Sequence, residues 1–137
     1  MNHSRLLGAV LVAWAASAKA ALPVECQDAA LLESRSLANL PEGVAALLGG
    51  GVTGTKGIAD RGQNFNATDL IDQALPMRRL VLAGVAAECV LVSEERGGRG
   101  HSFVVLAFVK QPNGGWQLVR DHVESEPKNL EELKAKY

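Results

Sequence analysis

The stretch RLVLAGVAAECVLVSEERGGRGHSFVVLAFVKQPNGGWQLVRDHV, residues 79–123, decides the fold. Its β-branched residues and short apolar alternations recur between glycine-containing turns, a pattern typical of strands joined by tight connections. We expect four strands, Arg79–Val85, Cys89–Glu94, His101–Val109 and Trp116–Val123. Because the links between them are short, consecutive strands should pair as hairpins. The sequence therefore predicts a four-stranded antiparallel meander.

The third expected strand is apolar on both faces. Its side chains alternate between two sets, which are Phe103, Val105, Ala107 and Val109 on one face and Val104, Leu106 and Phe108 on the other. A strand with this composition should be covered on both sides. We expect the N-terminal part of the chain to cover one of them.

Helices are expected on both flanks of this region. Residues Asp28–Ala38 carry apolar or small side chains at helical spacing, and Pro41–Gly49 has a proline suited to a first turn and a glycine at its end. Asn66–Pro76 has the start signal of a short helix, and Asn129 followed by Glu132 predicts a C-terminal one. The expected fold class is α+β, with N-terminal helices packed on the four-stranded meander and a short C-terminal helix.

The first twenty residues have the organisation of an export signal. A short segment with one fixed charge, Arg5, precedes an uncharged apolar run from Leu6 to Ala16. The small residues of Ala18-Lys19-Ala20 then suit signal peptidase, so we expect cleavage after Ala20. The apolar run is too short to span a bilayer, so we expect no membrane anchor after cleavage. Residues 1–20 are thus interpreted as a signal peptide and residues 21–137 as one exported domain, periplasmic or secreted.

Two cysteines, Cys26 and Cys89, follow the expected cleavage site. An even number of cysteines in an oxidising compartment predicts a disulfide. A metal pair would require more ligands, and a reactive C-x-x-C motif is absent from the sequence. We therefore expect a bond between Cys26 and Cys89, worth about 4 kcal/mol in the loop-entropy model.

The charge balance argues against nucleic acid as a partner. Removing Arg5 and Lys19 from the 14 basic residues leaves 12 against 15 acidic residues, a net charge of −3. Such a chain lacks the basic footprint of proteins that bind nucleic acid or anionic membranes.

Two loops contain the candidate binding residues. The polar stretch after the glycine-rich segment Gly49–Gly57 is the longest in the expected mature chain, and long loops on a rigid scaffold often bind partners. The turn Arg96–Gly100 has two guanidinium groups around glycines, which fits either a soluble hairpin tip or a backbone nest for an anion. The candidate binding residues are Asp60, Arg61, Asn64, Asp69, Arg96, Arg99 and His101.

Signals of catalysis are weak. Gly49–Gly57 lacks the lysine position of a phosphate-binding loop, and His101 and Ser102 are adjacent, so in a strand they point to opposite faces. His101 and His122 could meet across neighbouring strands, but zinc-ligand spacing is missing. We expect no cofactor, no metal and no catalytic residue.

These observations favour a small exported, non-catalytic binding protein. It would act by contact with another envelope or extracellular protein, as an inhibitor, an immunity protein or an accessory protein. A small-ligand carrier or minor hydrolase, with a pocket between sheet and helices, is the alternative. A structural envelope component without a discrete site is a third interpretation.

Overall fold

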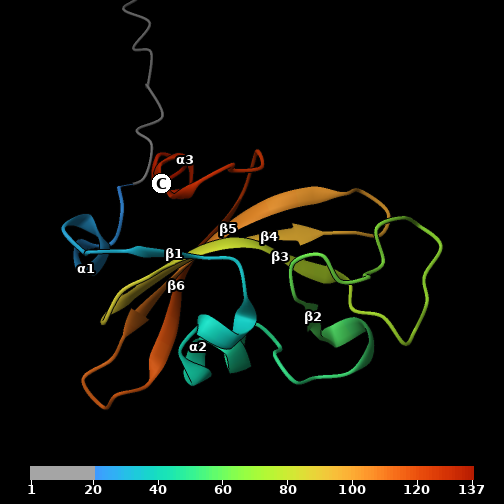
Figure 1. Cartoon of the computed structure of the whole chain (residues 1–137), viewed down its shortest axis with the longest axis horizontal. Helices are drawn as coiled ribbons and strands as arrows, with labels where there is room; N and C mark the ends of the chain where they lie inside the picture. The colour runs from blue at the N-terminus through green and yellow to red at the C-terminus, as the bar shows by residue number, and fades with distance from the viewer. Residues whose placement is uncertain (1–20) are drawn as a thin grey trace, which may run out of the picture.

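Four long strands form the centre of one sheet in the computed structural model, which describes residues 21–137 (Figure 1). They are β3 (Arg78–Val85), β4 (Cys89–Arg96), β5 (Ser102–Lys110) and β6 (Trp116–Glu124). Each pairs antiparallel with the next along the chain, so the meander and its strands are confirmed. The expected signal peptide, residues 1–20, lies outside the described residues.

The sheet is larger than expected, because two short strands add to β3. β1 (Leu32–Ser34) pairs with it antiparallel, and β2 (Ile58–Ala59) pairs with it in parallel. The six strands run in the order β1-β3-β4-β5-β6, with β2 also on β3. The molecule is thus mostly one antiparallel sheet with short helical segments, and the expected fold of N-terminal helices packed on four strands is wrong.

The helix expected over Asp28–Ala38 is absent. Its place is taken by β1 and by the 3-10 turn η1 (Leu37–Asn39). The physical reason is the edge of β3, whose backbone would otherwise lack a partner opposite residues 83–85. Pairing with that edge outweighs a weak local helical preference, as tertiary context often does.

The helical segments that do form are short. They are α1 (Val24–Gln27), α2 (Glu42–Leu47), α3 (Leu130–Lys134) and the 3-10 turn η2 (Gly54–Lys56). α2 and α3 match the expected helices after Pro41 and Asn129, and the Asn129 side chain accepts a hydrogen bond from the Glu132 amide at 2.9 Å. The helix expected over Asn66–Pro76 is absent, and the segment consists of turns.

Apolar clusters cover both faces of the sheet. The cluster on the α2 side includes Val44, Val92 and Phe108, and the cluster on the α3 side includes Leu91, Val105 and Leu133. Figure 1 shows α2 below the sheet and α3 above it. β5 therefore contributes to both clusters, as its sequence predicts.

The expected disulfide is present between Cys26 and Cys89, with their Cα atoms 5.3 Å apart. Both cysteines are fully buried. The bond ties α1 to the first residue of β4 on the α3 side of the sheet. Among residues 21–137, no helix has the length and apolar character needed to cross a membrane.

Candidate functional site

The loop after β2 is held in shape by one buried side chain, that of Asn66. Its amide nitrogen donates to the carbonyl oxygens of Asp72 and Leu75 at 2.9 and 2.8 Å, and its side-chain oxygen accepts from the Asp72 amide at 2.8 Å. These bonds use the side chain that would have capped a helix. They close residues 66–76 into a compact loop.

The turn between β4 and β5 lies against this loop. The amides of Gly97 and Gly98 donate to the carbonyls of Met77 and Asn66, both at 2.9 Å. A Cβ atom at Gly97 would collide with the backbone of Asn66, so only glycine allows this approach. The loop 66–77 and the turn 97–100 together form one surface, which we call the loop–turn face.

The loop–turn face presents two adjacent apolar side chains. Leu70 is 83% exposed and Ile71 is 40% exposed. The side chains of Met77 and Ile71 both lie close to Gly98, so the turn packs against the loop. Apolar side chains held in water by an ordered loop are a common feature of binding surfaces.

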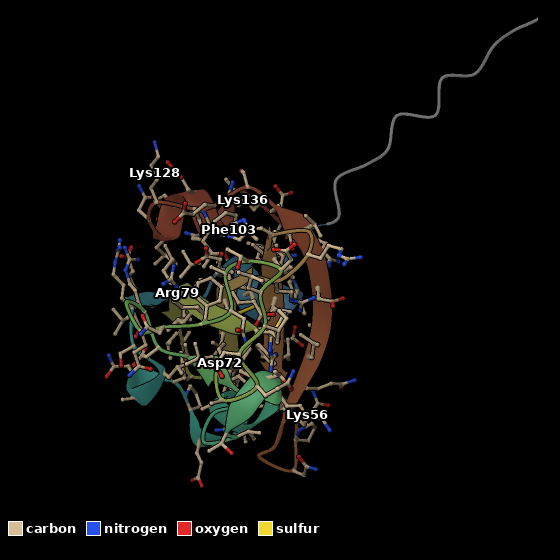
Figure 2. All side chains as sticks on the ribbon, turned by 90° about the vertical axis from the view of Figure 1, so that its right-hand side faces the viewer. Lys56, Asp72, Arg79, Phe103, Lys128 and Lys136 are labelled. Carbon is tan, nitrogen blue, oxygen red and sulfur yellow. A yellow bond between two sulfur atoms is a disulfide. The ribbon has the colours of Figure 1, made fainter. Side chains whose placement is uncertain are left out.

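A chain of polar contacts that includes Arg79, which is labelled in Figure 2, anchors this end of the sheet. Glu95 accepts from the Arg79 guanidinium at 2.8 and 3.2 Å, and its other oxygen lies 2.7 Å from Nε2 of His101. The Arg79 guanidinium also lies over the ring of Phe65, 4.3 Å from its centre. These contacts therefore tie together β3, β4, the loop after β2 and His101, the residue before β5.

The environment of Glu95 shifts its acidity. Burial by itself raises the pKa of Glu95, but hydrogen bonds from His101 and Arg79 and the charge of Arg79 outweigh it. The resulting pKa lies below the ordinary value for a glutamate. Glu95 is thus stabilised as a carboxylate by its two partners.

A pocket of about 240 Å³ opens beside this chain of contacts. It is lined by Arg61, Gly62, Arg79, Leu80, Val81, Glu95 and Glu126. Nη1 of Arg61 donates to the carbonyl of Val81 at 2.9 Å, at the irregularity where β3 has neither β1 nor β2 beside it. Arg61 therefore covers the part of the β3 edge that lies between β1 and β2, while β4 pairs with the other edge of β3.

Of the expected binding residues, Arg61 and His101 lie near this pocket, Arg61 as part of its lining and His101 through Glu95. Asp60 holds the chain at residues 36–37 in place, because its carboxylate accepts hydrogen bonds from Ser36 Oγ and from the amide of Leu37. Arg96 binds the fully buried Glu94 at 2.6 Å on the opposite face of the sheet from Glu95.

The other three expected residues are exposed. Asn64, Asp69 and Arg99 have no side-chain hydrogen bond or ion pair within residues 21–137. Asp69 directly precedes Leu70, and Arg99 directly follows Gly98, which lies close to Ile71. The Gly97 and Gly98 amides bind carbonyls, and they are therefore not available to form a nest for an anion.

Sequence reasoning missed four residues that build this region: Phe65, Leu70, Arg79 and Glu95. The sequence patterns place Leu70 inside the expected helix Asn66–Pro76, Arg79 at the start of an expected strand, and Glu95 in the link that follows the expected strand Cys89–Glu94. One signal was available, since antiparallel pairing that continues one residue beyond the expected strand Cys89–Glu94 places Glu95 opposite Arg79.

The geometry offers no catalytic constellation among the described residues. His101 contacts Glu95, whereas His122 lies 2.8 Å from the carbonyl of Lys136 and packs edge-on against Tyr137, so the two histidines are not brought together. Within residues 21–137, no group of three or more His, Cys, Asp or Glu side chains could hold a metal ion.

Comparison with protein-family models, with curated protein sequences and with solved structures finds no match.

Proposed function

We propose that this chain is an exported, non-catalytic binding protein that contacts another envelope or extracellular protein through its loop–turn face. The observation that carries the proposal is the pair Leu70 and Ile71, which are exposed on a loop that the buried Asn66 orders by hydrogen bonds. A partner that covers them would remove apolar surface from water, which is the main driving force of association.

The rigidity of the loop supports this proposal. Three hydrogen bonds of Asn66 and two of the glycine turn order the backbone before any partner arrives. A preordered loop loses less conformational entropy on binding, so more of the contact energy contributes to affinity. Asp69, which precedes Leu70, and Arg99, which follows Gly98, supply charges that can select among partners.

Export is part of the proposal. It is supported by the buried disulfide between Cys26 and Cys89, a bond typical of proteins in oxidising compartments. The signal-like composition of residues 1–20 agrees with it. Recovery of a chain that begins at Ala21 would support export, and recovery of the intact Met1 end with both thiols free would contradict it.

The contact can be tested by capture from envelope extract and culture medium of the producing cells. The immobilised, disulfide-bonded wild type is compared with a variant carrying Leu70→Ser and Ile71→Ser. The matched control carries Leu118→Ser and Val119→Ser, which replaces another adjacent pair, 43% and 45% exposed, on β6. Leu118 pairs with Phe108, at the far end of β5 from the turn.

A protein retained in stoichiometric amount by the wild type and the control, and at least about tenfold less by the Leu70/Ile71 variant, would support the proposal. Equal retention by all three proteins would contradict the role of the loop–turn face. Absence of any stoichiometric protein on the wild type would contradict the proposed function itself.

A further inference from the structure

We propose that the pocket lined by Arg61 and Glu126 binds a small zwitterionic ligand, of the size of an amino acid or dipeptide. The site is separate from the loop–turn face. It goes beyond the protein contact proposed above, and neither proposal requires the other.

Arg61 is fixed in an orientation that suits a ligand. Its Nη1 atom donates to the Val81 carbonyl at 2.9 Å, which attaches one corner of the guanidinium to β3. Within residues 21–137, its remaining N–H groups have no side-chain acceptor. Gly62, the next lining residue, has no heavy atom within 4 Å of the position that a Cβ atom would take, so no neighbour closes the pocket at this point.

Neighbouring acidic groups do not satisfy Arg61. The hydrogen bond from Arg35 is the main cause that lowers the pKa of Glu33, and the charge of Arg61 makes only a small contribution. The Glu33 carboxylate already accepts from Arg35 and from the Leu130 amide. It is therefore occupied by partners other than Arg61.

The wall of the pocket is already neutralised. Arg79 donates to Glu95 through two nitrogens, and the second oxygen of Glu95 is bound to His101. This pair contributes polarity to the wall and leaves little net charge for a ligand to meet. The charges that still lack an ion-pair partner among the described lining residues are Arg61 and Glu126.

Glu126 lies on the segment between β6 and α3 and is exposed. In the part of the chain that the structure describes, its carboxylate has no hydrogen bond, and it makes no ion pair with Arg61. The pocket thus has one unpaired positive group and one unpaired negative group in the same lining.

These charges define the chemical class of the ligand. A carboxylate matches the planar fork of an arginine, and an ammonium group matches a glutamate. A simple anion would also meet Glu126, and a simple cation would also meet Arg61, so a molecule bearing both charges fits best. The volume of about 240 Å³ lies below the usual range for drug-sized ligands, and the charged lining disfavours lipids.

The proposal can be tested by amide NMR titration of the protein as it is recovered from the producing cells, with its disulfide intact. The probes are alanine, the dipeptide Ala-Ala, N-acetyl-Ala-Ala and Ala-Ala amide. We expect saturable shifts at Arg61, Gly62 and Val81 with one or both zwitterions, with a Kd of about 1 mM or tighter. The acetylated and amidated probes should each bind at least about tenfold more weakly, because each lacks one charge.

Two variants locate the binding groups. Glu126→Gln removes an exposed charge without disturbing a described contact, and Arg61→Lys keeps the charge but loses the fork. Both should weaken binding of the preferred zwitterion at least about tenfold, whereas the exposed control Glu131→Gln should bind as the wild type does. An unchanged melting temperature of Glu126→Gln separates loss of binding from loss of folding.

Absence of saturable shifts up to about 10 mM ligand would overturn the proposal, since such binding is too weak for a formed site. Equal binding of the zwitterions and the two singly charged probes would overturn it as well. So would wild-type affinity of Glu126→Gln. None of these results would affect capture through Leu70 and Ile71, so the two proposals fail independently.

Discussion

Replacing Glu95 by glutamine should destabilise the fold by about 2 kcal/mol at neutral pH. The Glu95 side chain is only 14% exposed, and the substitution removes charge-assisted hydrogen bonds to Arg79 and His101. Such bonds contribute about 1.5–3 kcal/mol each when buried, and the partial exposure of both partners reduces that contribution. For a domain of this size, 2 kcal/mol corresponds to a fall in melting temperature of roughly 6–10 °C.

The loss should depend on pH in a defined direction. The pKa of Glu95 is lowered in the folded state, so its stabilisation is fully present above the unfolded pKa, near 4.5. It is lost as the pH falls through the folded pKa, because protonation removes the charge that Arg79 binds. The difference between wild type and Glu95→Gln should therefore shrink as the pH falls below about 4.5.

Urea unfolding of both proteins between about pH 3 and pH 8 measures this difference. Glu131→Gln is the matched control, because Glu131 is exposed and makes only a surface ion pair with Lys134 at 3.7 Å. Its effect should stay below about 0.5 kcal/mol. Wild-type stability of Glu95→Gln at neutral pH, or a loss that does not change with pH, would refute the reasoning.

Three further changes test other parts of the structure. Replacing Cys26 and Cys89 together by serine should lower the free energy of unfolding by about 4 kcal/mol, measured by urea unfolding without reductant. A loss below about 1 kcal/mol would contradict the view that the disulfide stabilises the fold by restricting the unfolded chain. Asn66→Ala should lower the free energy of unfolding by about 2–3 kcal/mol and speed amide hydrogen exchange at Asp72. Unchanged exchange at Asp72 would show that Asn66 does not order the loop. Tyr137→Phe should leave the melting temperature unchanged or raise it, because the buried hydroxyl has no hydrogen-bond partner in the described chain and burial raises its pKa well above the ordinary value. A fall in the free energy of unfolding above about 1 kcal/mol would show that the hydroxyl has a partner.

The meander could be predicted because its signals are local. The alternation in residues 103–109 and the glycine-containing turns specify strands and hairpins without reference to the rest of the chain. The capped C-terminal helix follows from Asn129 and Glu132 in the same way. The disulfide could be predicted from cysteine count and expected compartment.

What could not be predicted depends on contacts between distant segments. β1 forms because it can pair with the edge of β3, and the residues Leu32–Ser34 carry no local signal that predicts a strand. Asn66 has the residue type of a helix cap, yet it bonds across a loop that Gly97 and Gly98 support from another part of the chain. The pocket likewise brings together Arg61, which follows β2, and Glu126, which follows β6, although 65 positions separate them in the sequence.

The measurement that tests the central claim most directly is site-specific photo-crosslinking in the producing cells. A photoreactive amino acid is placed at position 70, where Leu70 projects from the loop–turn face, or at position 118 on β6. We predict one discrete adduct with a second protein from position 70 and none from position 118. The same adduct from both positions, or none from position 70, would contradict the claim that this loop is the binding surface.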